Sequence, residues 1–166
     1  MTGPIADLFA EYHQSLVRML YRRTGDRDRA EEIAQEVFAR AVAAPPRNPR
    51  PWLFAVALNL VREEGRRAVR RDRRLVLYQA EQPDSFEGPD ETMDRGDRIA
   101  RVRSALDSLT ERDRVALLLK AEGFNYEDIA ATLGLARGAV GTTLSRARRR
   151  LVEAYRAGEG QHDVAS

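Results

Sequence analysis

Apolar residues recur every three or four positions along most of this chain, which is the spacing of an amphipathic helix. The first such stripe occupies residues 5–20, and Gly25 is placed to end its helix. A second stripe occupies residues 30–41, with Asp26 or Asp28 available to cap its N-terminus. The pattern predicts two successive helices in the first quarter of the chain.

A proline-rich stretch separates these helices from a third. Residues 44–51 contain four prolines, whose fixed φ and missing N–H argue against helix there. The apolar pattern resumes near Pro51 and continues to about Arg74, or as far as Tyr78. Residues 80–94 then hold six acids and two prolines. We predict a flexible acidic linker over residues 79–94, either a plain spacer or a segment that folds over its basic flanks.

Helical spacing returns after the linker and continues almost to the C-terminus. We expect four helices there, around residues 99–109, 115–119, 126–133 and 137–155. Thr110 and Asn125 are suitable N-caps for the second and third of them, and Gly134 ends the third. Residues 157–166 are expected to form a disordered tail. Because no segment alternates like a β-strand, the predicted fold class is all-α, with two small helical domains.

The last two predicted helices have the order of a helix-turn-helix, whose second helix lies in the DNA major groove. At about 100° per residue, Val140, Leu144, Ala147 and Leu151 fall on one face of the last helix, which must be the buried one. The opposite face carries Gly138, Thr142, Ser145, Arg146, Arg149 and Glu153. Arg146 is the strongest candidate there for a bidentate contact to guanine, and a solvated helix face is the alternative.

Composition narrows the possible chemistry. The chain has no cysteine, and its two histidines lie near opposite ends, so a thiol nucleophile, a Ser-His-Asp triad and a His/Cys metal site are not expected. Its longest apolar run, residues 52–61, is interrupted by Asn59 and is too short to span a bilayer. Of 28 basic residues 27 are arginine, which suits phosphate and base edges. We expect an intracellular protein without metal or cofactor, and not an enzyme.

The third predicted helix carries a second basic surface. Its polar positions recur at helical spacing: Asn59, Arg62, Arg66, Arg70 and Arg73. An amide and arginines beside the aromatic Trp52 and Phe54 suit a nucleic-acid strand with exposed bases. Trp52 has an alternative and favoured interpretation as a core anchor, because large aromatic residues are mostly buried. The second helix instead presents a mostly acidic face, which fits a basic protein surface or solvent.

Four segments together resemble the extracytoplasmic-function (ECF) group of sigma factors, which direct bacterial RNA polymerase to promoters. Residues 30–38 (AEEIAQEVF) are similar to the polymerase-binding segment of that family, and residues 51–59 (PWLFAVALN) to the start of its promoter-melting helix. Residues 125–130 (NYEDIA) and 144–151 (LSRARRRL) are similar to its helix-turn-helix. The segments occur in the family's order and spacing.

The resemblance implies region 2 over residues 5–78 and region 4 over residues 95–156. Region 2 would bind core RNA polymerase, on a coiled coil of its largest subunit, and capture the non-template strand of the −10 element without ATP hydrolysis. Region 4 would bind the duplex −35 element near the polymerase flap region. The implied partners are core polymerase, promoter DNA and an anti-sigma factor, in the cytoplasm.

The resemblance also implies roles for individual residues. The expected −35 contacts are Arg137, Gly138, Thr142, Thr143, Ser145, Arg146 and Arg149. The expected −10 contacts are Asn59, Arg62, Arg66 and Arg70, with Asn59 at the position of the family asparagine that contacts a flipped base. The expected polymerase-binding residues are Glu32, Gln35, Glu36, Phe38 and Arg40.

Two features depart from the family pattern. Residues 43–51 are short, proline-rich and without the aromatic of many members, and Gly141 stands where many members carry Arg or Lys. The rival interpretation is a dimeric helix-turn-helix repressor whose first 80 residues form a sensor or dimerisation domain. The pattern on residues 51–66 argues against it, since a sensor needs no second row of arginines.

Overall fold

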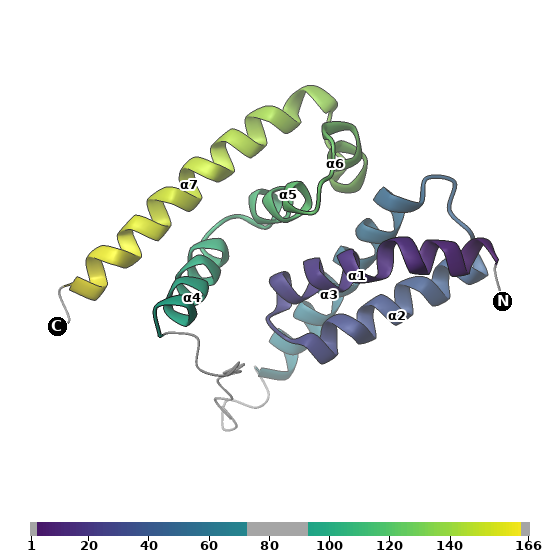
Figure 1. Cartoon of the computed structure of the whole chain (residues 1–166), viewed down its shortest axis with the longest axis horizontal. Coiled ribbons are helices and arrows are strands. Elements are labelled where there is room, and N and C mark those ends of the chain that lie inside the picture. The colour runs from purple at the N-terminus through teal and green to yellow at the C-terminus, as the bar shows by residue number, and fades with distance from the viewer. Residues whose placement is uncertain (1–2, 73–92, 164–166) are drawn as a thin grey trace. The chain divides into compact units, whose positions relative to one another are not determined.

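The computed structural model describes residues 3–72 and 93–163, and every regular element in these two ranges is an α-helix (Figure 1). The chain divides into two compact units, residues 1–85 and residues 86–166. The prediction of an all-α fold with two helical domains is confirmed. Most of the predicted linker, residues 79–92, lies outside the described residues, and Met93 and Asp94 belong to a helix.

The first unit begins with α1 (Pro4–Thr24) and α2 (Arg27–Ala43), which are joined by a two-residue turn. Gly25 has a φ of 76°, a left-handed conformation that favours glycine, and its N–H donates to the Tyr21 carbonyl at 2.7 Å. Asp26 then caps α2, since its carboxylate accepts the N–H of Arg29 at 3.1 Å. Both signals were predicted, and Asp26 rather than Asp28 is the cap.

The third helix of this unit, α3 (Pro49–Asp72), begins earlier than the proline content suggests. Pro49 and Pro51 both lie in its first turn, where a backbone N–H has no helical acceptor and its loss costs nothing. The expectation that residues 44–51 exclude helix is therefore wrong for residues 49–51. The predicted end between Arg74 and Tyr78 lies outside the described residues.

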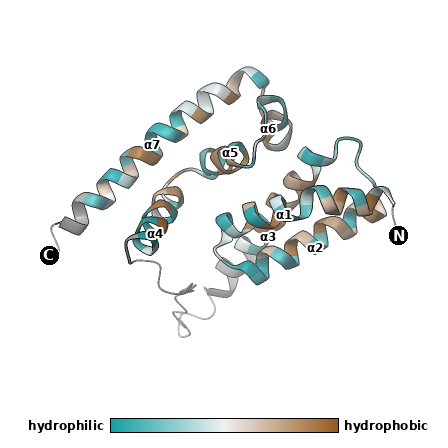
Figure 2. Cartoon of the chain, viewed as in Figure 1, coloured by the Kyte–Doolittle hydropathy of each residue, from teal (hydrophilic) through white to brown (hydrophobic). Residues whose placement is uncertain are grey.

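The core of the first unit forms where the apolar stripes of α1, α2 and α3 meet. Figure 2 shows hydrophobic and hydrophilic positions alternating along each helix, as amphipathic packing requires. Each large side chain removed from water stabilises the fold by about 1.5–3 kcal/mol. Among the described residues of this unit, those with no exposed surface are Leu16, Met19, Leu20, Ala30, Ala34, Val37, Ala41, Leu53, Phe54 and Ala57.

The second unit contains α4 (Met93–Asp107), α5 (Glu111–Ala121), α6 (Tyr126–Leu133) and α7 (Arg137–Asp163). The Thr110 hydroxyl accepts the N–H of Asp113 at 3.3 Å, and the Asn125 side chain accepts the N–H of Asp128 at 2.8 Å. Gly134 has a φ of 67° and ends α6. Both predicted caps and the predicted stop are confirmed, and α6 with α7 forms the expected helix-turn-helix.

The core of the second unit confirms the predicted buried face of α7. Val140, Leu144 and Ala147 have no exposed surface, whereas Leu151 is half-buried. Val115, Leu119 and Ile129 of the same unit are also fully buried. Burial on this side fixes which side of α7 faces solvent.

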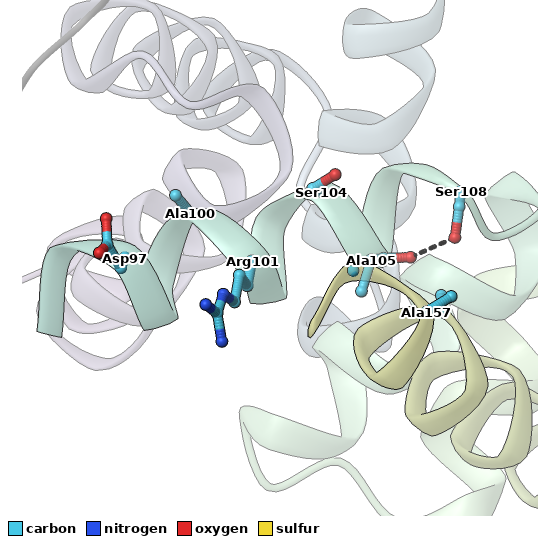
Figure 3. A pocket seen from close by; sticks show the side chains of 9 residues that line it. Asp97, Ala100, Arg101, Ser104, Ala105, Ser108 and Ala157 are labelled. Carbon is cyan, nitrogen blue, oxygen red and sulfur yellow. Dashed lines mark hydrogen bonds between the residues drawn. The ribbon is translucent and has the colours of Figure 1, made fainter. Parts of the chain in front are cut away.

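α7 is longer than predicted, because its C-terminal part packs against α4. The expected disordered tail is wrong for residues 157–163, which are helical. Small residues from the two helices, including Ala100, Ala105 and Ala157, line an open cavity of about 550 Å³ between them (Figure 3). Within residues 3–72 and 93–163, no helix is long and apolar enough to cross a membrane.

Candidate nucleic-acid interface

α7 presents a polar row opposite its buried side, which we call the α7 face: Gly138, Thr142, Ser145 and Arg149. All four are exposed, as is Arg137 at the start of the helix. Spacings of four, three and four place them on one side of the helix. The predicted exposure of these five residues is confirmed, and their contact with DNA stays a prediction.

Thr143 does not belong to the α7 face. Its side chain is only 5% exposed, and its hydroxyl donates to the Ala139 carbonyl at 2.8 Å. Position 143 lies three residues after Val140 and four before Ala147, so it shares their buried side. The prediction that Thr143 contacts DNA is wrong for this reason.

Arg146 lies at the margin of the α7 face and is bound on one side to Asp113 of α5. Its Nη2 donates to Oδ1 of Asp113 at 2.9 Å and its Nε to Oδ2 at 3.4 Å. Nη1 of Arg150 lies 3.4 Å from the same Oδ2. The prediction that Arg146 points freely outward therefore needs correction, because two of its five N–H donors are engaged within the protein.

Asp113 is completely buried, and its charge is compensated by its neighbours. The hydrogen bond from Arg146 lowers the pKa of this carboxyl, and the positive charges of Arg146 and Arg150 and the Thr110 hydroxyl add to that effect. Burial opposes the shift, but the net pKa lies below the ordinary value, so the carboxylate is ionised at neutral pH. Sequence reasoning did not single out Asp113, because periodicity along one helix cannot reveal a partner 33 residues away.

α3 presents a second polar row, which we call the α3 row: Asn59, Arg62 and Arg66. All three are exposed and share one side of the helix, as predicted. Arg70 continues the spacing along α3, but its side chain lies outside the part that the structure describes. Their contact with a DNA strand stays a prediction.

The two aromatic residues proposed to lie beside the α3 row differ in exposure. Phe54 has no exposed surface, so its interpretation as a platform for a base is wrong. Trp52 is half-buried. Arg29 of α2 bonds Glu64 of α3 at 2.6 Å and ties the two helices together near this row.

α2 presents the predicted mostly acidic surface, which we call the α2 face: Glu32, Gln35, Glu36 and Arg40. All four side chains are exposed. Within this face, Nε of Arg40 donates to Oε1 of Glu36 at 3.1 Å, one helical turn away. An exposed pair of this kind contributes little to stability, so these side chains remain available to a partner.

Phe38 does not belong to the α2 face. It is 5% exposed, and its ring lies 5.0 Å from that of Phe9 on α1. Phe9 in turn stacks on His13 at 4.2 Å. The expectation that Phe38 touches polymerase is wrong, because this aromatic packs α2 onto α1. Sequence reasoning missed the cluster, because its members lie on two different helices.

Gly141 receives a role that the sequence did not indicate. A Cβ at this position would lie 3.5 Å from Cε2 of Tyr126, so the half-exposed ring of Tyr126 rests against the recognition helix. The ammonium of Lys120 lies 5.6 Å from the centre of the same ring, within cation–π range. Position 141 is thus where α6 packs closely on α7.

The fold and its exposed rows define a class of protein: a helix-turn-helix DNA-binding factor with a second helical domain that carries its own basic row. Comparison with known proteins identifies the family. Residues 8–74 match the family described as "Sigma-70 region 2", and residues 99–151 match "Sigma-70, region 4".

Related proteins are similar in sequence to this chain over most of its length. It is 34% identical over 134 residues to the ECF RNA polymerase sigma factor EcfG of Rhodopseudomonas palustris (strain TIE-1), covering 77% of this chain and 72% of that protein. It is 33% identical over 153 residues to the ECF RNA polymerase sigma factor SigL of Mycobacterium tuberculosis (strain ATCC 25618 / H37Rv), covering 87% and 84%.

A solved structure shows the same fold. The sigma factor RpoE from Bartonella quintana, solved in complex with the anti-sigma factor NepR, is 26% identical and matches with a TM-score of 0.63 over 90% of this chain and 97% of that one. The chain belongs to the ECF group of the sigma-70 family. It is a sigma factor that directs RNA polymerase to specific promoters for transcription initiation.

Proposed function

We propose that the α7 face reads the duplex −35 element from within the major groove. Its first half carries small polar side chains that suit base edges, and Arg149 further along suits phosphate. Gly138 has no side chain, and a Cβ built there would meet no protein atom within 4 Å. The start of the helix can therefore approach DNA closely. Arg137 at the first position adds a phosphate contact.

The α3 row is proposed to capture the non-template strand of the −10 element. Extruding a base costs a few kcal/mol, and stacking or hydrogen-bonding a captured base returns about 1–3 kcal/mol. Asn59 would hydrogen-bond a flipped base, while Arg62, Arg66 and Arg70 would follow the backbone. Opening is then a shift of population toward the melted state, with no ATP hydrolysis and no chemical step catalysed by this chain.

The α2 face is proposed to bind core RNA polymerase on a coiled coil of its largest subunit. Exposed Glu32, Gln35 and Glu36 offer acceptors to a basic surface, and Arg40 completes the face. Phe38 supports this contact only by holding α2 against α1. The second unit would lie near the flap region of polymerase while α7 holds the −35 duplex.

Two further features of this function are proposed from the relatives. A related sigma factor was solved with an anti-sigma factor, so we expect a protein of that kind to hold this chain inactive as well. Its site of action is expected to be the cytoplasm, where core polymerase meets chromosomal DNA.

One observation supports this proposal above all: each unit exposes a polar row suited to nucleic acid, the α3 row in the first and the α7 face in the second. The α2 face, in addition, suits a protein partner. The experiment is run-off transcription on fragmented genomic DNA with core polymerase and the purified full chain. We expect initiation at a discrete set of promoters that core polymerase alone does not use. Tight binding to a palindromic operator without polymerase, and no initiation, would establish the repressor instead.

A further inference from the structure

We propose that Asp113 is a positioning residue for promoter recognition. Its buried carboxylate holds one edge of the Arg146 guanidinium, so that the other edge is presented to a guanine of the −35 element. The inference rests on the proposed function of the α7 face. It assigns a role in base recognition to a residue of α5, outside the recognition helix itself.

The hydrogen bonds of Arg146 define which edge is free. A guanidinium offers a side edge, formed by Nε and one terminal nitrogen, and an end edge, formed by both terminal nitrogens. Asp113 occupies the side edge, through Nη2 at 2.9 Å and Nε at 3.4 Å. The end edge keeps Nη1 and the second hydrogen of Nη2, which is the paired donor set that O6 and N7 of guanine accept.

The place of Arg146 on α7 is consistent with this role. It lies four residues after Thr142 and three before Arg149, both exposed members of the α7 face. Its side chain is 38% exposed although it contacts a carboxylate with no exposure at all. Arg146 therefore has one side inside the protein and the other toward the surface that DNA would meet.

A structural role alone accounts poorly for a carboxylate at position 113. Replacing a buried ion pair by well-packed apolar residues is often neutral or stabilising, so packing does not require a charge here. A buried carboxylate does fix the orientation of a long, flexible side chain. An arginine already held in its binding conformation loses less conformational entropy on meeting a base.

Arg150 explains how the carboxylate tolerates this arrangement. Its Nη1 lies 3.4 Å from Oδ2 of Asp113, and its side chain is 50% exposed. When the guanidinium of Arg146 contacts DNA as well as Asp113, Arg150 still compensates the negative charge of the buried carboxylate. Arg150 thus assists the pair without occupying the end edge of Arg146.

The test measures base discrimination by the full chain bound to core polymerase. A promoter identified by the transcription experiment is varied one base pair at a time through its −35 element, and the affinity of the complex is measured for each duplex. Asp113→Asn keeps the shape of the side chain but removes its charge. Arg146→Lys keeps a charge that reaches Asp113 but has no second planar edge. Arg149→Ala is the matched control on the same face.

We expect Asp113→Asn and Arg146→Lys to lose about tenfold of discrimination at the same single G·C pair. Their affinity for the promoter already substituted at that pair should change less than twofold. The double variant should lose no more discrimination than Arg146→Lys alone, because both residues act on one contact. Arg149→Ala should weaken binding to every duplex by a similar factor, as a phosphate contact does.

Two results would overturn the proposal. Unchanged discrimination in Asp113→Asn, with discrimination lost in Arg146→Lys, would make Asp113 a structural partner only. Equal weakening on all duplexes by Arg146→Lys would assign its end edge to phosphate. If Asp113→Asn does not fold by circular dichroism, Asp113→Glu replaces it, since the displaced carboxylate keeps its charge but should still reduce discrimination at that pair. Failure of the unmodified chain to initiate at any promoter would instead refute the proposed function.

Discussion

At the scale of single residues, neighbouring positions on α2 have opposite environments. Phe38 is buried against Phe9, whereas Gln35 is exposed on the α2 face. Phe38→Ala should lower the free energy of unfolding of the first unit by about 3–5 kcal/mol, because it leaves a cavity. Gln35→Ala should change that free energy by less than about 0.5 kcal/mol but weaken binding to core polymerase.

Trp52 allows the effect of these substitutions on stability to be separated from their effect on polymerase binding. It is the chain's single tryptophan and lies in α3, so its fluorescence during urea unfolding reports on the first unit. Binding to core polymerase is measured for both variants at a temperature where the unmodified chain and Phe38→Ala are folded. A strong loss of binding in folded Phe38→Ala, with none in Gln35→Ala, would return Phe38 to the polymerase contact.

Asp113 makes the stability of the second unit sensitive to acid. The hydrogen bond and charge of Arg146 hold its pKa below the ordinary value in the folded state, so the folded chain binds fewer protons than the unfolded chain as pH falls. The stabilisation is complete above the unfolded pKa of about 4 and is lost as pH falls through the lower folded value. We expect the free energy of unfolding of this unit to decline below about pH 4.

The comparison that isolates this effect is Asp113→Asn, since other carboxylates also titrate in acid. Urea unfolding followed by circular dichroism at several pH values between 3 and 7 should give a difference between the two chains that shrinks as pH falls. At neutral pH the difference should be about 1.5–3 kcal/mol, the contribution of a hydrogen bond to a charged group. A difference independent of pH would show that the charge of Asp113 is not what stabilises the unit.

At the scale of elements, the sequence correctly predicted the helix ends that depend on local residues. Gly25, Thr110, Asn125 and Gly134 begin or end helices where expected, because caps and left-handed turns depend on residues close in sequence. The length of α7 was underestimated, because its last turns are helical through packing on α4. Periodicity along one helix cannot reveal a partner distant in sequence.

The turn between α6 and α7 allows a matched pair of glycine substitutions. Gly134→Ala should lower the free energy of unfolding of the second unit by about 1–2 kcal/mol, because its φ of 67° disfavours any Cβ. Gly138→Ala should leave that free energy unchanged or slightly raised, since a Cβ there meets nothing within 4 Å and alanine favours helix. Both are measured by thermal unfolding of the full chain.

The same pair tests how closely α7 approaches DNA. Gly138→Ala should reduce affinity for the −35 duplex although the protein stays fully stable, because the added methyl lies on the α7 face. A Gly138→Ala chain with unchanged DNA affinity would show that the start of α7 stays away from the groove. An equally stable Gly134→Ala chain would contradict the strain assigned to the turn.

At the scale of the whole molecule, the sequence predicted two helical domains and most of the exposed candidate residues. The family resemblance misassigned Thr143 and Phe38 as contact residues, although their spacing matches the buried side of each helix, and Phe54 was wrongly set beside the α3 row; all three are buried. Sequence reasoning also missed Asp113, whose partners come from another helix. Exposure along one helix face was therefore readable from spacing, whereas contacts between helices, such as that of Asp113 with Arg146, were not.

The two units are expected to fail at different steps when each loses one exposed residue. Asn59→Ala, in the first unit, should leave binding to core polymerase and to duplex promoter within about twofold but reduce opening of the −10 element. The reason is that the lost amide would contact only a base already extruded from the duplex. Arg149→Ala, in the second unit, should weaken the initial complex and leave the opened fraction of bound promoter unchanged.

Permanganate reactivity of unpaired thymines measures opening, and competition binding measures the initial complex. Equal loss in both assays for Asn59→Ala would indicate a folding defect, and a pre-melted promoter that did not bypass the Asn59→Ala defect in initiation would show that Asn59 acts after melting.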